Sequence, residues 1–420
     1  MPDDHTATEH SRPHADGQVG SAEHGDVGAR ILRLPPGADG HHLFREVRRR
    51  GPLVHSRKGL LFTASWTTAN AILRSKDFGA VPTMVSGSNL PDWGNHLVHP
   101  LDDSFFSLDP PHHTRLRAAV APWFARNSAP AWGTHIESVV DSCLDSLADR
   151  DSADLIRTLA EPVPVFTICR LLGVPAADLP TFTRWGHAIT ALMDGPRSDT
   201  EARRIRDVCA EMTDYFHRRI TATAHQPGQG EGLIAGLAAR CPVDMAERDV
   251  VATSGMMLLA GFATTVNLIG SGLRILLADA GQRRAARGNW GAVVEETLRH
   301  ASPVQYVVRR AIRPTRVQGI RVPAHTPVVI LLAGANRDPS VFAHAEDFDP
   351  TRTDVGHHLT FGTGIHYCMG TALARAEAHA VLGRFFTRFP DAAPNGPATP
   401  RPSRVLHGPA TLPVRLTAPR

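Results

Sequence analysis

The chain has 420 residues, and its 45 Lys and Arg residues against 41 Asp and Glu residues give a net charge of +4. The basic residues are scattered and, apart from Lys58 and Lys76, all are arginine. Nucleic-acid-binding proteins more often gather positive charge into a stripe or patch, so this pattern argues against such a partner. A basic face for an acidic protein partner stays open.

The N-terminal residues 1–28 are polar and lack the apolar core of a signal or membrane anchor, which favours a disordered tail. No low-complexity linker divides the remainder, so we expect one domain over residues 29–420. The five cysteines are widely spaced and form no Cys-x-x-Cys pair, which argues against a disulfide framework or zinc cluster. These features predict a cytoplasmic protein without a membrane anchor.

In the first half of the chain, the sequence predicts one hairpin, one long loop and helices. Residues 51–65 read as a hairpin with a Lys-Gly turn. Residues 81–111 are rich in Pro and Gly and weakly periodic, and a loop of this length is usually functional or mobile. Residues 134–150 place apolar side chains at helical steps of three and four, and residues 207–220 repeat that pattern.

The second half predicts a buried helix and a second β region. Residues 247–280 are apolar nearly all round, so this helix should run through the middle of the molecule. Residues 291–301 show helical periodicity again, and residues 315–339 read as short strands separated by Gly and Pro. The expected fold class is therefore mainly α with small β-sheets.

One cysteine stands in an unusual setting, in the stretch FGTGIHYCMG over residues 361–370. Its glycines allow tight turns and the close approach of a bulky group. Strong helix formers follow Cys368, so it lies near a helix N-terminus, where a thiolate is stabilised. Such a thiolate can be a nucleophile with His366 as base, a redox centre, or a ligand to haem iron.

This stretch resembles the haem-binding loop of the cytochrome P-450 family, whose pattern is roughly Phe-Gly-x-Gly-x-His/Arg-x-Cys-x-Gly. The resemblance covers about residues 40–415. It implies a mainly helical fold with a long central helix over the haem and a Cys-ligand loop before a C-terminal helix. It also implies that Cys368 is the axial ligand of a haem b iron, with Phe361, Gly362 and Gly370 beside the haem.

Two further motifs occur in the family's order. In EETLR, Glu296 and Arg299 match the Glu-x-x-Arg pair, which alone would read as a surface ion pair. The family completes this network with an arginine where this chain has Asp347, and Arg352 is a candidate substitute. In DPPHHTRLR and two later stretches, four cationic side chains match residues that hold the haem propionates: His113, Arg117, Arg309 and His366.

The stretch LLAGFATTVN resembles the family's central helix, although taken alone it would read as core packing. Small Ala260 and Gly261 would leave room for dioxygen, and Thr264 matches the threonine that assists dioxygen activation. Ala263 is the main departure, because the family usually has Asp or Glu there as a proton relay. Water held by Thr264 or by a substrate hydroxyl could relay protons instead, or the reaction could need fewer protons.

The resemblance implies a monooxygenase that uses O2 to hydroxylate or epoxidise a hydrophobic small molecule in bacterial secondary-metabolite biosynthesis. No flavin or nicotinamide fingerprint is present, so electrons would come from NAD(P)H through a ferredoxin reductase and a ferredoxin. Three alternatives stay open: oxidative coupling of aromatic units, a peroxide-driven enzyme, and a non-catalytic haem-binding sensor. The expected substrate pocket comprises Met84, Trp93, Phe182, Met193, Phe262, Val307 and Leu406.

Overall fold

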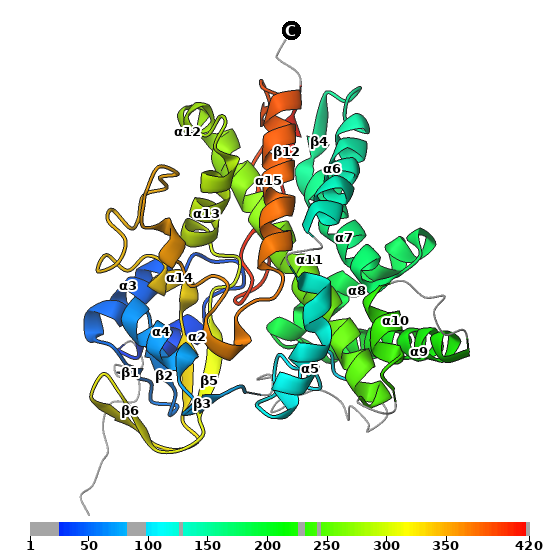
Figure 1. Ribbon diagram of the computed structural model, residues 1–420. Helices are drawn as coiled ribbons and strands as arrows, with labels where there is room; N and C mark the ends of the chain where they lie inside the picture. Colours follow the sequence, from blue (N-terminus) through cyan, green and yellow to red (C-terminus); the bar gives the residue numbers. More distant parts are fainter. Residues whose placement is uncertain (1–24, 82–97, 126–128, 226–231, 242–244, 417–420) are drawn as a thin grey trace, which may run out of the picture.

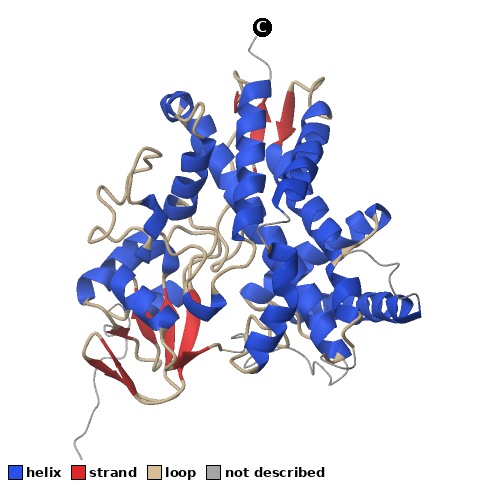
Figure 2. Ribbon diagram, in the orientation of Figure 1, coloured by secondary structure: helices blue, strands red, loops and turns tan. Residues whose placement is uncertain are grey.

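Helices dominate the computed structural model, which describes residues 25–81, 98–125, 129–225, 232–241 and 245–416 (Figures 1 and 2). The longer α-helices are α3 (His41–Arg50), α4 (Trp66–Arg74), α5 (His112–Val120), α6 (Ala129–Asp145), α7 (Pro162–Leu172), α8 (Leu179–Thr190), α9 (Asp199–His225), α11 (Glu247–Ala278), α13 (Trp290–His300) and α15 (Thr371–Arg388). The shorter ones are α2 (Val27–Leu32), α10 (Leu233–Ala238), α12 (Ala280–Ala285) and α14 (Leu332–Ala335). The predicted helices within residues 134–150, 207–220, 247–280 and 291–301 are therefore confirmed.

The largest sheet has five strands in the order β1-β2-β8-β5-β3 and lies on the opposite side of the molecule from α9 and α10 (Figure 1). Its strands are β1 (Val54–His55), β2 (Leu61–Thr63), β3 (Phe78–Gly79), β5 (Val307–Ala311) and β8 (Pro327–Ile330). The predicted hairpin is β1–β2, in which Val54 pairs with Phe62 and Gly59 takes a φ of 76° in the turn. The β2–β8 pair is parallel and the other pairs are antiparallel.

Residues 315–339 were only partly predicted. They form the β6 (Thr315–Val317) and β7 (Ile320–Val322) hairpin and then β8, but residues 332–335 are the short helix α14. The sequence prediction also missed β5, because its VVRRA run shows no clean alternation of apolar and polar residues. The smaller sheets are formed by β4 (Ser152–Asp154), β9 (Ala393–Pro394), β10 (Thr399–Pro400), β11 (Pro409–Thr411) and β12 (Pro413–Arg415).

Helix α11 runs through the middle of the molecule and contacts α7, α8, α9, α13 and α15 (Figure 1). Among the described residues it alone has the length and apolar composition to cross a membrane, but 83% of its most apolar window is buried inside the molecule. A helix that is apolar on every face suits this position, because neighbouring helices cover each face. The predicted central helix is therefore confirmed.

The first helix that the structure describes starts before the predicted tail boundary at residue 28. Helix α2 begins at Val27, which is buried, and the side chain of Asp26 caps it by accepting a hydrogen bond from the Ala29 N–H at 3.0 Å. The other carboxylate oxygen of Asp26 accepts from the Ser56 hydroxyl at 2.9 Å. These bonds join α2 to the β1–β2 hairpin.

Candidate active site

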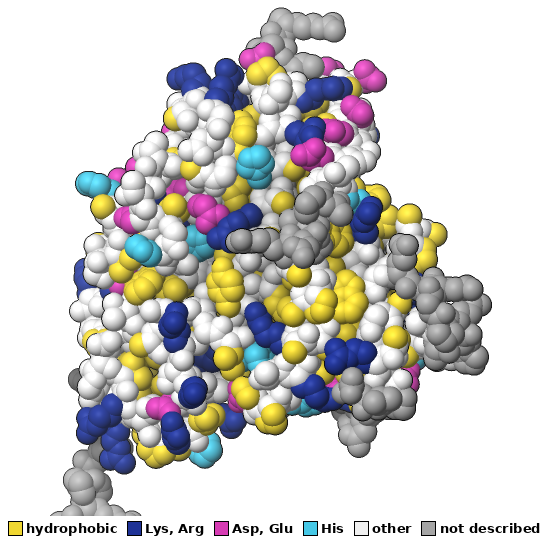
Figure 3. All heavy atoms as spheres, in the orientation of Figure 1, with side chains coloured by type: hydrophobic (Ala, Val, Ile, Leu, Met, Phe, Trp, Pro, Cys, Tyr) yellow, Lys and Arg dark blue, Asp and Glu magenta, His cyan; other side chains and the backbone are white. Residues whose placement is uncertain are grey.

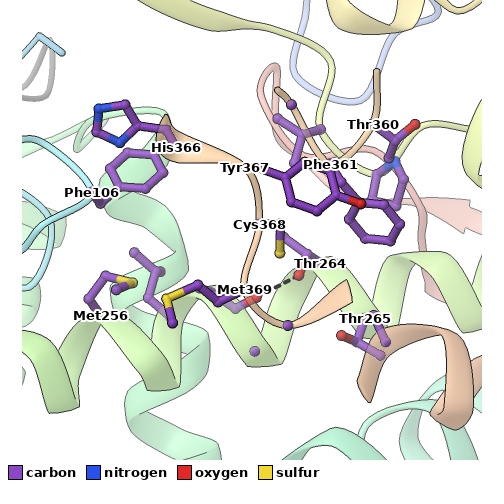
Figure 4. A pocket seen from close by; sticks show the side chains of 18 of the residues that line it. Phe106, Met256, Thr264, Thr265, Thr360, Phe361, His366, Tyr367, Cys368 and Met369 are labelled. Atoms are coloured by element: carbon purple, nitrogen blue, oxygen red, sulfur yellow. Dashed lines mark hydrogen bonds between the residues drawn. The ribbon is translucent and has the colours of Figure 1, made fainter. Parts of the chain in front are cut away.

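Cys368 lies on a loop between the Leu359–Thr360 segment and α15, two residues before the helix N-cap Gly370. The loop is closed by a backbone hydrogen bond from the Cys368 N–H to the Phe361 carbonyl at 3.0 Å. The side chain is accessible although protein surrounds it, because it faces a cavity (Figure 4). Burial raises the pKa of the thiol, and the Gly370 N–H, Arg117 and Arg375 act in the opposite direction.

Gly364 shows why this loop requires glycine. Its φ is 73°, a left-handed conformation that other residues rarely adopt. A Cβ atom there would lie 2.4 Å from the Leu73 carbonyl oxygen on α4. The glycine therefore lets the loop pack directly against the C-terminal end of α4.

A fully buried ion pair stands behind the loop. Arg299 donates to both carboxylate oxygens of Glu296, at 2.7 Å each, and both side chains have no exposed surface. Arg352 Nε lies 3.0 Å from Glu296 Oε2 and Arg352 is 5% exposed. Arg352 thus binds Glu296 as the candidate substitute for the arginine that the family has at the position of Asp347. Asp347 itself contributes only its backbone carbonyl, which accepts from Arg299.

A second buried network, to which no motif in the sequence pointed, joins this ion pair to the cysteine loop. Asn336 donates to the Thr360 hydroxyl at 2.8 Å and accepts from the Leu359 N–H at 2.6 Å. Thr360 in turn donates to the Leu298 carbonyl at 2.6 Å, next to Arg299 on α13. These residues are far apart in the chain, so no local sequence pattern could have identified the network.

Arg375 and Glu295 support the loop on its outer side. The guanidinium of Arg375 lies over the Phe361 ring, 4.7 Å from its centroid, in a cation–π contact. It also donates to Glu295 at 2.5 and 2.9 Å. The hydrogen bond from His358 together with these two bonds holds the pKa of Glu295 near 2 against the effect of burial. The contact orients Phe361 beside the cavity.

The four cationic residues singled out by the sequence lie close together. Arg117 donates to the Tyr367 carbonyl, and the rings of His113 and His366 lie 4.4 Å apart. Arg117, Arg309 and His366 line the cavity, whereas His113 is buried behind His366.

These two arginines and two histidines, called the cation cluster after Arg117 and Arg309, have little anionic compensation among the described residues. Burial lowers the pKa of His366 to about 3 and that of Arg309 to about 10, and neighbouring cations depress the His366 pKa further. Asp109 is the carboxylate that acts on both His113 and Arg309. His366 Nε2 is buried without a hydrogen-bond partner in the described part of the chain. Such a cluster is suited to an anionic ligand.

The opposite wall of the cavity is formed by α11. Ala260, Gly261 and Thr264 line it, and the Thr264 hydroxyl donates to the Ala260 carbonyl at 2.6 Å (Figure 4). Ala263 is fully buried on another face of the helix and does not line the cavity. Thr265, the next residue along α11, also lines the cavity.

The cavity has a volume of about 280 Å³ and a mostly apolar lining. Cys368 and Thr264 are directed into it from different elements (Figure 4). The cavity is also lined by Gly362, Gly370, Met193, Val307 and Leu406. Met256, Met257 and Phe106 also line it, although no sequence pattern singled them out.

Two residues of the expected substrate pocket lie elsewhere. Phe182 packs against Trp185 and Tyr215 at the α8–α9 contact. Phe262 packs against Gly186 and His187 of α8. Both are fully buried in the core, since each faces the neighbouring helix instead of the cavity. Met84 and Trp93 lie outside the described residues.

Comparisons with known proteins agree on one family. The pattern of the family described as Cytochrome P450 matches residues 290–408. The chain is 35% identical to the putative cytochrome P450 140 of Mycobacterium tuberculosis, over 93% of this chain and 92% of that protein. It is 34% identical to the 6-deoxyerythronolide B hydroxylase of Saccharopolyspora erythraea, over 73% of this chain and 76% of that protein.

The fold agrees as well. The crystal structure of ligand-free CYP164A2 from Mycobacterium smegmatis superposes with a TM-score of 0.81 at 32% identity, covering 93% of this chain and 99% of that one. The mainly helical fold with small sheets expected from the sequence is therefore confirmed. The chain belongs to the cytochrome P450 family of haem-containing monooxygenases.

Proposed function

We propose that the protein is a haem-thiolate monooxygenase that hydroxylates or epoxidises an uncharged, hydrophobic small molecule in bacterial secondary metabolism, with Cys368 as the axial ligand of the haem iron. The observation that carries this proposal is the cavity between Cys368 and Thr264, with its cation cluster at one edge. A haem b bound there supplies the reductive activation of dioxygen.

The residues present fit a haem. The Cys368 thiol faces the cavity beside a helix N-terminus, which suits a thiolate ligand. Arg117, Arg309 and His366 offer donors to the two propionate carboxylates, with His113 behind them. The unpartnered His366 Nε2 and the sparse anionic compensation both support this role. Phe361, Gly362 and Gly370 would border the porphyrin.

On the α11 side of the cavity, the protein provides open space and a hydroxyl group for the reaction. Ala260 and Gly261 leave the helix surface open toward the cavity, and Thr264 presents a hydroxyl already oriented by its bond to the Ala260 carbonyl. The surrounding apolar side chains exclude water, which strengthens polar interactions at the reacting atoms.

The lining favours an uncharged substrate. Met193, Met256 and Met257 give a flexible apolar surface that adapts to irregular shapes. Val307 and Leu406 extend this apolar surface. The relative from Saccharopolyspora erythraea, named for 6-deoxyerythronolide B, supports a substrate of the secondary-metabolite class.

Electrons would come from NAD(P)H through a ferredoxin reductase and a ferredoxin, in the cytoplasm. On the face toward the viewer in Figure 3, Lys and Arg side chains are spread around apolar ones in the lower half of the view, below the place of α15 in Figure 1. That mixed face is suited to a transient acidic partner.

The lack of an acid at Ala263 supports a second candidate, the oxidative coupling of two aromatic units without oxygen insertion. Product masses after turnover with candidate substrates test the two functions. Hydroxylation or epoxidation adds one oxygen atom from labelled dioxygen, whereas coupling removes hydrogen and adds none. Turnover sustained by hydrogen peroxide alone, with no gain from electron donors, would instead indicate a peroxide-driven enzyme.

A further inference from the structure

Methionines gather around the cavity, and no step described so far uses their sulfur atoms. Among the described residues, Met193, Met256, Met257 and Met369 line it. Met256 and Met257 lie on α11, Met193 lies between α8 and α9, and Met369 comes directly after Cys368. A thioether is readily oxidised, because its sulfur takes up one oxygen atom to form a sulfoxide. These side chains are therefore chemically reactive as well as apolar.

The two methionines of α11 lie next to the position at which dioxygen would react. Met256 precedes Ala260 by four residues, and Met257 precedes Gly261 by four. Residues four apart share one face of a helix, so each thioether lies one turn from the small residues that leave space beside Thr264. Figure 4 shows Met256 and Thr264 on the same side of α11. In a cavity without substrate, these two thioethers are oxidisable groups close to the reacting position.

Two other methionines provide a comparison inside the same molecule. Met212 of α9 packs against α11, since a Cβ atom at Gly255 would lie 2.9 Å from its Cε, but it does not line the cavity. Met245 lies just before α11 and does not line the cavity either. Met212 and Met245 are 1% and 2% exposed, against 3% and 6% for Met256 and Met257. Exposure to bulk solvent would therefore not separate the two pairs, whereas facing the cavity would.

Met369 provides a comparison within the cavity itself. It lies on the wall of Cys368, whereas Met256 and Met257 lie on the opposite wall with Thr264. A haem held by Cys368 would stand between these walls. An oxygen atom delivered on the Thr264 side would reach the methionines of α11 but not Met369, while peroxide arriving from solvent makes no such distinction.

We propose that, when no substrate is bound, the enzyme transfers an oxygen atom to the thioether sulfur of Met256 or Met257. One atom of O2 forms the new sulfur–oxygen bond and the other leaves as water, with two electrons from the ferredoxin and two protons from solvent. The thioether is oxidised to the sulfoxide and dioxygen is reduced. The product places a polar group in the apolar lining. This inference rests on the proposed monooxygenase function.

The first test locates the oxygen atom. The haem-loaded wild type consumes labelled dioxygen without substrate, driven by spinach ferredoxin, its reductase and NADPH, with catalase present to remove peroxide from solvent. Tandem mass spectrometry of the peptides then identifies the oxidised residues. Labelled oxygen should appear at Met256 or Met257 in many-fold higher yield than at Met212, Met245 and Met369, and leaving out the reductase should abolish it.

Two results of that test would overturn the proposal. In the first, dioxygen is consumed but neither Met256 nor Met257 carries labelled oxygen. In the second, Met212, Met245 or Met369 is labelled to the same extent as the methionines of α11, which is the pattern expected of diffusing peroxide.

The second test uses variants and the mass of the intact protein. The double variant Met256→Leu, Met257→Leu removes both sulfur atoms at similar side-chain volume, a change that cores usually tolerate. Its gain of labelled oxygen should be several-fold lower than that of the wild type. Met212→Leu is the matched control and should gain as much as the wild type. An undiminished gain in the double variant would place the oxidation on other residues and contradict the assignment.

The carbon monoxide difference spectrum separates failure of this inference from failure of the proposed function. A wild type and double variant with haem-thiolate spectra, both consuming dioxygen without labelling of α11, would contradict the inference alone. A wild type without that spectrum would contradict the proposed function as well.

Discussion

The buried Glu296–Arg299–Arg352 group shows how single residues hold the cysteine loop. Arg299 binds Glu296 with two hydrogen bonds and also donates to the carbonyls of Asn336, Ala345 and Asp347. One side chain therefore ties α13 to the segment that leads into the loop. A charge buried this deeply is stable only while its partners stay in place.

Replacing Arg299 by Ala should lower the free energy of unfolding by about 3–5 kcal/mol, because Glu296 is left as a buried charge that keeps only Arg352 and the Asp349 N–H as partners. Urea unfolding followed by circular dichroism measures the loss. Arg197→Ala is the matched control, since Arg197 is 55% exposed in its pair with Glu201. That change should cost less than about 1 kcal/mol. Equal losses in the two variants would contradict a structural role for the buried pair.

Among the residues that hold the cysteine loop, the sequence could identify only those that belong to a recognisable motif. Glu296, Arg299 and Cys368 stand in recognisable motifs, so the sequence alone is enough to select them. Arg352 could not be assigned, because its contact with Glu296 depends on how the chain between residues 336 and 352 is folded. Asn336 and Thr360 carried no local signal at all, since their partners lie on other elements.

Helix packing around α11 explains both the successes and the errors of prediction from the sequence. A continuous apolar run predicted the helix and its central position. It could not predict which residues face the cavity, because a helix buried on every side has no polar face to orient it. Phe262 was therefore assigned to the pocket, although its ring lies against Gly186 of α8.

The α8–α11 contact depends on the absence of a side chain at Gly186. A Cβ atom there would lie 2.8 Å from Cδ1 of Phe262. Gly186→Ala should therefore lower the free energy of unfolding by about 1–3 kcal/mol through overpacking. Gly133→Ala on α6 is the control, because no atom lies within 4 Å of its Cβ position. That variant should be as stable as the wild type or more so by about 0.5–1 kcal/mol, and a Gly186→Ala protein of the same stability would refute the packing argument.

Three histidines join distant parts of the molecule outside the cavity. His41 begins α3, His300 ends α13, and His407 lies between β10 and β11. Burial lowers the pKa of His41 to about 3 and that of His300 to about 4, and Arg337 beside them lowers both further. Asp39 partly opposes this effect at His41. In the folded protein these histidines are therefore neutral at neutral pH.

The sign of the pH effect follows from the lowered pKa values. Protonation favours the unfolded chain, where the usual histidine value of 6.5 applies. The stability that these sites contribute is thus fully present above pH 6.5 and is lost as the pH falls toward 4. Urea midpoints between pH 7.5 and 5 should decrease in the wild type and decrease less steeply in a His41→Gln, His300→Gln double variant. Identical slopes would show that other groups cause the acid sensitivity.

For the molecule as a whole, the sequence predicted the mainly helical architecture more accurately than the boundary of the N-terminal tail. The mainly helical fold and the order of its motifs could be predicted, because long periodic helices and a ten-residue loop are local features. The predicted tail boundary at residue 28 lies inside α2, because Asp26 caps this helix and binds the β1–β2 hairpin through contacts that no local sequence pattern shows. Single-domain organisation over residues 29–420 stays a prediction.

The most direct test of this account is the carbon monoxide difference spectrum of the reduced protein, recorded for the wild type and for Cys368→Ser. The wild type should show the strongly red-shifted Soret band of a haem-thiolate protein, and Cys368→Ser should lose it. A wild-type band at the position of histidine-ligated haem, or a red-shifted band that persists in Cys368→Ser, would contradict Cys368 as the iron ligand and with it the proposed site.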